Sequence, residues 1–187
     1  MKKIIIIFIF KIVFISNSNS STMLIDDFFF SQNSSSEKKW SLITDKVMGG
    51  ISEGKVKRDK ISGKDCYRLQ GNVSTKNNGG FIQIRTLFEP SIELNKFKGI
   101  YAQVLGNNKR YFFHIRTKYT LAPWQFYSYS FEAQNKWTEI KIPFSDFKKS
   151  NFYQPKKLRN QKIKSIGLVA GFENYKADIC LGEIGFY

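Results

Sequence analysis

Hydrophobic and polar residues alternate along most of the chain in short runs, and Gly, Asn, Ser or Asp separate one run from the next. A period of two is typical of β-strands, whereas helical spacing is hard to find after the first twenty or so residues. The runs that alternate in this way lie at 54–58, 66–74, 81–85, 100–104, 110–117, 125–131, 138–143, 163–170 and 177–187. Their regular spacing predicts an all-β sandwich or barrel rather than βαβ units.

The segments between these runs contain turn signals, such as NNGG at 77–80 and GNN at 106–108. Asn and Gly tolerate the left-handed backbone that tight turns require. We find no internal repeat and no shift in composition that would mark a second domain. One β-sandwich domain at 22–187, with about nine or ten strands, is therefore expected.

The first 21 residues have a different pattern. Lys2 and Lys3 precede an apolar stretch at 4–15, and a small polar segment follows at 16–21. This order is typical of an export signal, and the apolar stretch is shorter than the ~20 residues that span a bilayer. We expect a cleaved signal peptide at 1–21 and an exported protein, periplasmic or at the cell surface. An uncleaved leader would instead act as an N-terminal membrane anchor.

Composition supports strands and raises a question of charge. The chain has 18 Phe, 9 Tyr and 3 Trp, which favour pleated surfaces. Its formal net charge is +15, and residues 22–187 keep +12 because the leader contributes three lysines and no acid. The lysines are spread along the chain and no recognition helix accompanies them, so we predict no nucleic-acid partner. Contact with an anionic membrane or wall surface stays open.

Residues for catalysis or metal binding are few. His114 is the single histidine, and no G-x-S-x-G elbow presents a serine. The glycines at 49–54 lack the spacing of a phosphate-binding loop, and the acidic residues are scattered. The sequence predicts no enzyme activity, no cofactor and no catalytic metal.

The two cysteines, Cys66 and Cys180, lie far apart in early and late predicted strands. Without a C-x-x-C pair, neither a zinc ribbon nor a thioredoxin-type site is supported. A disulfide between them and two separate buried thiols both remain open.

A binding face is easier to derive. Alternation places His114 and Arg116 on the same face of the predicted strand 110–117. Aromatic rings combined with donor groups are the chemistry that grips a sugar or a partner's backbone. The predicted binding face consists of His114, Arg116, Trp124, Gln125, Tyr127 and Tyr129. In the alternative interpretation, half of these residues complete the hydrophobic core.

Five short motifs, in order, resemble the complex I intermediate-associated protein 30 family. They are Trp40 with TDKVMGGIS (44–52), GNVS with NNGGF (71–81), YFFHIRT with PWQFYSY (111–129), WTEIKIPFSDF (137–147) and SIGL (165–168). The signature loop, residues 40–52, contains the family's residues Trp40, Asp45, Val47, Met48, Gly49, Gly50 and Ser52. We expect a structural role for it: Asp45 caps a turn, Met48 fills the core, and the glycines allow a bend.

The resemblance implies a galactose-binding-like jelly-roll β-sandwich, related in shape to carbohydrate-binding modules. Mitochondrial members act as chaperone-like assembly factors for respiratory complex I, without known catalysis. It therefore implies a non-catalytic module for a protein partner, with an extracytoplasmic carbohydrate-binding module as the alternative. Modules of this shape often hold a structural Ca²⁺, for which Asp26, Asp27 and Glu183 are weak candidates here.

Overall fold

The computed structural model describes residues 21–27, 40–158 and 161–187. The predicted leader, apart from its last residue, lies outside this part of the chain. In the described ranges, no helix has the length and apolar character needed to cross a membrane.

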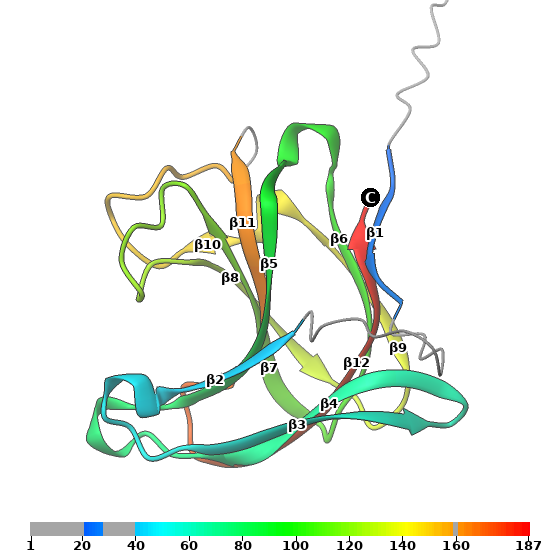
Figure 1. The fold of residues 1–187 in the computed structure, drawn as a ribbon, viewed down its shortest axis with the longest axis vertical. Helices are drawn as coiled ribbons and strands as arrows, with labels where there is room; N and C mark the ends of the chain where they lie inside the picture. Colours follow the sequence, from blue (N-terminus) through cyan, green and yellow to red (C-terminus); the bar gives the residue numbers. More distant parts are fainter. Residues whose placement is uncertain (1–20, 28–39, 159–160) are drawn as a thin grey trace, which may run out of the picture.

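The described residues form two antiparallel sheets of six strands each, packed face to face (Figure 1). Sheet A has the order β3 (Glu53–Ile61), β4 (Lys64–Val73), β12 (Tyr175–Phe186), β6 (Gly99–Leu105) and β9 (Thr138–Pro143), and β1 (Met23–Asp26) pairs with the end of β12. Sheet B has the order β10 (Lys148–Lys149), β8 (Tyr127–Ala133), β7 (Lys109–Thr117), β11 (Lys162–Gly171), β5 (Phe81–Glu93) and β2 (Ser41–Thr44). Single 3₁₀ turns occur at η1 (Asp45–Met48), η2 (Lys76–Asn78), η3 (Leu94–Lys96) and η4 (Phe144–Asp146).

The predicted all-β sandwich is confirmed, and each predicted run corresponds to a strand. The strands that the sequence missed, β1, β2 and β10, are four, four and two residues long, too short to show a period. Strand β5 continues from the predicted end at residue 85 to Glu93, through Pro90. Proline lacks a backbone donor and usually argues against a strand, so the sequence around Pro90 does not indicate this extension.

The core fills the space between the two sheets. Leu69 and Ile179 from sheet A and Ile84 and Phe113 from sheet B are fully buried within it. Trp40, just before β2, is also fully buried, and its indole Nε1 donates to the Asp26 carboxylate at 3.0 Å. Trp40 therefore belongs to the core and not to a binding surface.

Cys66 of β4 and Cys180 of β12 form a disulfide between neighbouring strands, with their Cα atoms 5.6 Å apart. Of the two alternatives left open by the sequence, the structure has the disulfide. The bond joins positions that are 114 residues apart in the chain.

Candidate functional site

Sheet B turns one face to the core and the other to a groove of about 510 Å³. The pairing of β5, β11 and β7 decides which residues form the floor of this groove. Gly167 of β11 pairs with Arg85 of β5 on one side and with His114 of β7 on the other, and Ser165 pairs with Arg116. Because successive side chains of a strand point to opposite faces, these residues face the groove while Ile84 faces the core.

The middle of the floor is hollow because β11 contributes small residues there. Gly167 lies between Arg85 and His114, and Ser165 lies beside Arg116. A Cβ atom added to Gly167 would lie 3.1 Å from the Oε1 atom of Gln83, closer than most side chains tolerate. A larger residue at position 167 would therefore fill the space that a ligand would use.

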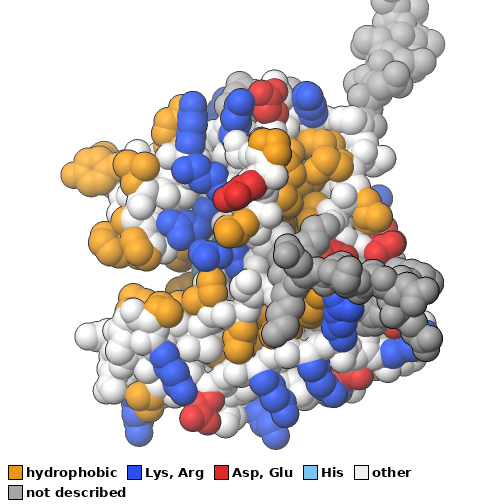
Figure 2. Space-filling view, in the orientation of Figure 1, with side chains coloured by type: hydrophobic (Ala, Val, Ile, Leu, Met, Phe, Trp, Pro, Cys, Tyr) orange, Lys and Arg blue, Asp and Glu red, His pale blue; other side chains and the backbone are white. Residues whose placement is uncertain are grey.

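Two groups of loops form the walls, and Figure 2 shows the hollow between them on the left of the molecule. One wall is the β7–β8 loop with Pro123, Trp124 and Phe126, and the other contains η1, residues 78–81 and Phe172. Large apolar side chains at the rim are open to solvent: Trp124 is 63% exposed, Phe172 57% and Met48 55%. The groove thus has apolar rims above a floor that carries polar groups.

His114 is enclosed on this floor. Its ring stacks on Phe126 with centroids 3.9 Å apart and an angle of 9° between the planes. Its Nε2 atom is buried and has no hydrogen-bond partner among the described residues. Burial lowers the pKa of His114 to about 3, because the protonated form would lose its hydration. At neutral pH the ring is therefore uncharged, and its Nε2 atom is a buried polar atom without a partner among the described residues.

This burial predicts a loss of stability in mild acid. Between about pH 7.5 and about pH 5.5 the unfolded chain protonates its histidine while the folded chain does not, so the free energy of unfolding falls by about 1.4 kcal/mol. Urea titrations at both pH values measure the change. Because His114 is the only histidine, His114→Gln should abolish this difference. An equal difference in both proteins would contradict the assignment.

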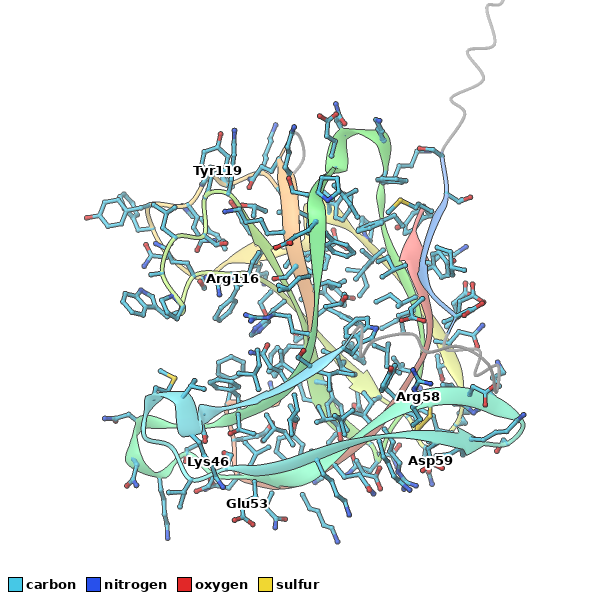
Figure 3. All side chains as sticks on the ribbon, in the orientation of Figure 1. Lys46, Glu53, Arg58, Asp59, Arg116 and Tyr119 are labelled. Carbon is cyan, nitrogen blue, oxygen red and sulfur yellow. A yellow bond between two sulfur atoms is a disulfide. The ribbon has the colours of Figure 1, made fainter. Side chains whose placement is uncertain are left out.

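Arg85 and Arg116 bring positive charge to the same floor. Burial lowers the pKa of both guanidinium groups, and the charge of Arg85 lowers that of Arg116 further. The Nη2 atom of Arg116 donates to the carbonyl of Ala122 at 2.9 Å and to that of Thr120 at 3.4 Å, which ties β7 to the β7–β8 loop. Figure 3 shows Arg116 beside the opening between the two groups of loops.

The wall that contains η1 and residues 78–81 depends on Asp45, the buried acid of the signature loop. Its carboxylate accepts hydrogen bonds from the Ser52 amide at 2.9 Å, the Ser52 hydroxyl at 2.5 Å, the Gly80 amide at 2.6 Å and the Phe81 amide at 3.3 Å. One carboxylate thus joins the signature loop to the NNGG turn. Asp45 was expected to cap only its own turn, but its carboxylate also binds residues 80 and 81, which are 35 and 36 positions away in the chain.

The glycines fit around this carboxylate. A Cβ atom on Gly50 or on Gly79 would overlap the Asp45 side chain, and Gly49 has a φ of 89°, in the left-handed region. The structural role expected for Gly49 and Gly50 has this physical basis. The expectation for Met48 is wrong, because its side chain lines the groove and does not fill the core. Val47 beside it is 76% exposed.

The structure divides the predicted binding face. His114, Arg116 and Trp124 line the groove, whereas Tyr127 is fully buried and donates from its hydroxyl to the Pro155 carbonyl at 2.8 Å. Tyr129 packs against the core from the same side of β8. The prediction assigned these two tyrosines to the wrong face, because His114 pairs with Ser128 and the sequence does not reveal that register.

Gln125 precedes β8 and organises the β7–β8 loop. Its Oε1 atom accepts from the amides of Leu121 at 2.7 Å and Ala122 at 3.1 Å. Many residues that line the groove were not predicted from the sequence, among them Gln83, Arg85, Phe126 and Phe172. For Gln83 and Arg85 a signal existed, since both alternate with Ile82 and Ile84 in a predicted strand.

The calcium candidates do not come together. In the part of the chain that the structure describes, no group of three or more His, Cys, Asp or Glu side chains could hold a metal ion. The Asp26 carboxylate accepts from Trp40, and the Glu183 carboxylate lies near Tyr101, whose pKa rises to about 12 through burial and the effect of this carboxylate. The structure therefore does not support a calcium site at Asp26, Asp27 and Glu183.

Comparisons with known proteins agree on the fold and name the family. The sequence profile described as complex I intermediate-associated protein 30 matches residues 28–181. A search of curated protein sequences finds no match. The family 11 carbohydrate-binding module of the cellulosomal cellulase Lic26A-Cel5E of Clostridium thermocellum has a similar structure, with a TM-score of 0.71, 18% identity, and coverage of 90% of this chain and 95% of that chain.

Two further solved structures are similar. The same kind of module from Clostridium thermocellum, in complex with a β-1,3-1,4-mixed-linked tetrasaccharide, has a TM-score of 0.69 at 18% identity and covers 88% of this chain and 94% of that chain. A family 30 carbohydrate-binding module has a TM-score of 0.52 at 12% identity, covering 72% and 91%. At these identities the likeness shows the fold, and the predicted jelly-roll β-sandwich is confirmed.

Proposed function

The chain belongs to the complex I intermediate-associated protein 30 family, and from this premise we propose that it is a non-catalytic binding module whose ligand, a glycan, lies in the groove of sheet B. One observation carries the proposal: the exposed indole of Trp124 stands at the rim of a floor of polar side chains. The family and the fold are both non-catalytic kinds of module, which agrees with the lack of catalytic motifs.

A sugar matches this arrangement in two ways. The flat, apolar face of a pyranose ring can stack on an indole, and its hydroxyls need donors and acceptors such as the side chains of Gln83 and Ser165. The groove opens to solvent between two walls on the left of the view (Figure 2), and its volume of about 510 Å³ leaves room for more than one sugar ring. The tetrasaccharide complex of a structurally similar module adds support.

Trp124→Ala tests the proposal. We expect glycan affinity to fall by about tenfold, or about 1.4 kcal/mol, because the stacking surface is lost. The fold should persist, since the hydrogen bond from the Ser150 hydroxyl goes to the backbone carbonyl of Trp124 at 3.0 Å. An array of soluble oligosaccharides identifies the tightest binder, and calorimetry then gives the affinities.

Tyr153→Ala is the matched control for this experiment. Tyr153 is 87% exposed and does not line the groove, so its removal should leave affinity unchanged. Equal losses in both variants, or a wild-type protein that binds no oligosaccharide, would refute the glycan proposal.

A protein partner is the second candidate, with a chaperone-like role in the assembly of a membrane complex. The family description supports it, and so do apolar side chains outside the groove: Leu121 is 84% exposed, Phe152 84% and Tyr153 87%. Affinity purification should then recover one specific partner from wild-type cells, and the double variant Phe152→Ser, Tyr153→Ser should lose it. Equal recovery by both proteins would remove this candidate.

Export is proposed for either function. The predicted signal at 1–21 supports it, as does the Cys66–Cys180 disulfide, because such bonds persist in oxidising compartments. Amino-terminal sequencing of the protein from separated cell fractions identifies both the compartment and the cleavage site.

A further inference from the structure

Arg85 and Arg116 are the two charged residues of the groove, and no Asp or Glu among the described residues lines it. Arg85 has neither an ion pair nor a hydrogen bond in the described part of the chain. The hydrogen bonds of Arg116 go only to neutral backbone carbonyls. Two cations thus share one semi-enclosed, largely apolar hollow without a counter-charge.

Another partly buried arginine of this protein, Arg68, has carboxylate partners for its whole guanidinium group. On sheet A, Arg68 donates from Nε and Nη2 to the two carboxylate oxygens of Asp178, both at 2.7 Å, and from Nη1 to Asp59 at 3.2 Å. These contacts raise the pKa of Arg68 and lower the pKa of Asp178. In the groove, by contrast, the pKa values of Arg85 and Arg116 are both lowered. Burial removes water from each charged guanidinium group, and no carboxylate among the described residues compensates for that loss.

An unpaired, half-buried charge destabilises the free protein, so a ligand of opposite charge would form an ion pair that no described residue provides. We propose that the groove binds an acidic oligosaccharide, one whose sugar rings carry a carboxylate or a sulfate, and that Arg85 and Arg116 hold this anionic group. The inference rests on the proposed glycan function and specifies the class of glycan.

The geometry allows both arginines to reach one anion. They come from β5 and β7, which flank β11 and therefore lie about 10 Å apart. On the groove face of β11, the residues between the two arginines are Ser165 and Gly167. Both are small, so no large side chain separates the two arginine side chains. The planar fork of an arginine matches the oxygens of a carboxylate or sulfate, which favours such a group over a hydroxyl.

The size of the groove indicates an acidic sugar chain rather than a single small anion. A volume of about 510 Å³ is far more than one carboxylate or sulfate fills. The remaining surface is apolar at Trp124 and Phe126 and neutral at Gln83 and His114, which suits ring faces and hydroxyls next to the charged group. The anion would therefore be one substituent of a larger, ring-bearing ligand.

Calorimetry with three tetrasaccharides of equal length tests the inference: a neutral mixed-linked β-glucan, an oligouronate and a sulfated oligosaccharide. We expect at least one acidic ligand to bind about tenfold or more tightly than the neutral one, and its affinity to fall as salt rises. Arg85→Gln and Arg116→Gln should each remove this preference. The melting temperature of Arg85→Gln should stay equal or rise, because an unpaired charge is removed.

Arg110→Gln is the matched control, since Arg110 also lies on β7 but is 61% exposed, pairs with Glu173 and is absent from the groove. Its acidic-sugar affinity should equal that of the wild type. If the neutral glucan binds as tightly as both acidic sugars, the inference is wrong while the glycan function stands. If no oligosaccharide binds, both are wrong. Tighter binding of an acidic peptide than of any sugar would also overturn the inference.

Discussion

Asp45→Ala is expected to lower the free energy of unfolding by about 4 kcal/mol, one of the two largest effects that we predict. The carboxylate is fully buried and accepts four hydrogen bonds, three of them from backbone amides. Hydrogen bonds to a charged group contribute about 1.5–3 kcal/mol each, and their loss leaves buried amides without partners. Urea denaturation followed by tryptophan fluorescence measures the change.

The same carboxylate predicts a dependence on acid. Burial acts to raise the pKa of Asp45, but the hydrogen bonds from Ser52, Gly80 and Phe81 outweigh it and hold the pKa below its ordinary value. A carboxyl with a depressed pKa in the folded state stabilises the protein above its unfolded pKa, and that stability is lost as the pH falls through the folded value. Below about pH 4, the difference in stability between wild type and Asp45→Asn should therefore shrink.

Controls separate this role from a role in binding. Asp146→Ala, at an exposed carboxylate, should change stability by no more than about 0.5 kcal/mol. Gly50→Val should resemble Asp45→Ala, because its side chain would overlap the carboxylate. A fully stable Asp45→Ala protein that had lost glycan or partner binding would show instead that the signature loop is the contact site.

Removal of the Cys66–Cys180 disulfide is the second large effect. The double variant Cys66→Ala, Cys180→Ala should lose about 3–5 kcal/mol of stability, because the bond restricts an unfolded chain over a separation of 114 residues. Alanine avoids placing a serine hydroxyl where both cysteine side chains are buried. The midpoint of urea denaturation, measured at equal protein concentration, gives the difference.

A reductant provides the internal control for the disulfide. Dithiothreitol should shift the urea midpoint of the wild type toward that of the double variant and leave the variant unchanged. A wild-type midpoint that does not move, with the thiols shown to be reduced, would contradict a stabilising role. Because the bond lies between adjacent core strands of sheet A, its loss should affect the whole fold and not the groove alone.

The strands and the family could be predicted from local patterns. Alternation predicted the strand at 110–117 and placed His114 and Arg116 together on one face, and the structure has both in the groove. The TDKVMGGIS segment predicted a structured loop at Asp45, and its buried hydrogen bonds agree with that role. These features depend on residues that are near one another in the chain, and such signals survive in a single sequence.

The groove itself could not be predicted, because it depends on which strands pair and in what register. Alternation gives two faces to each strand but does not say which face meets the core, so Tyr127 and Tyr129 were assigned to the wrong side of β8. Arg85 and Arg116 are 31 positions apart in the sequence and become neighbours only because β11 pairs between β5 and β7. The sequence alone determined the all-β class, the family and the shared strand face of His114 and Arg116, while the pairing of distant strands decided where charge, aromatic rings and empty space meet.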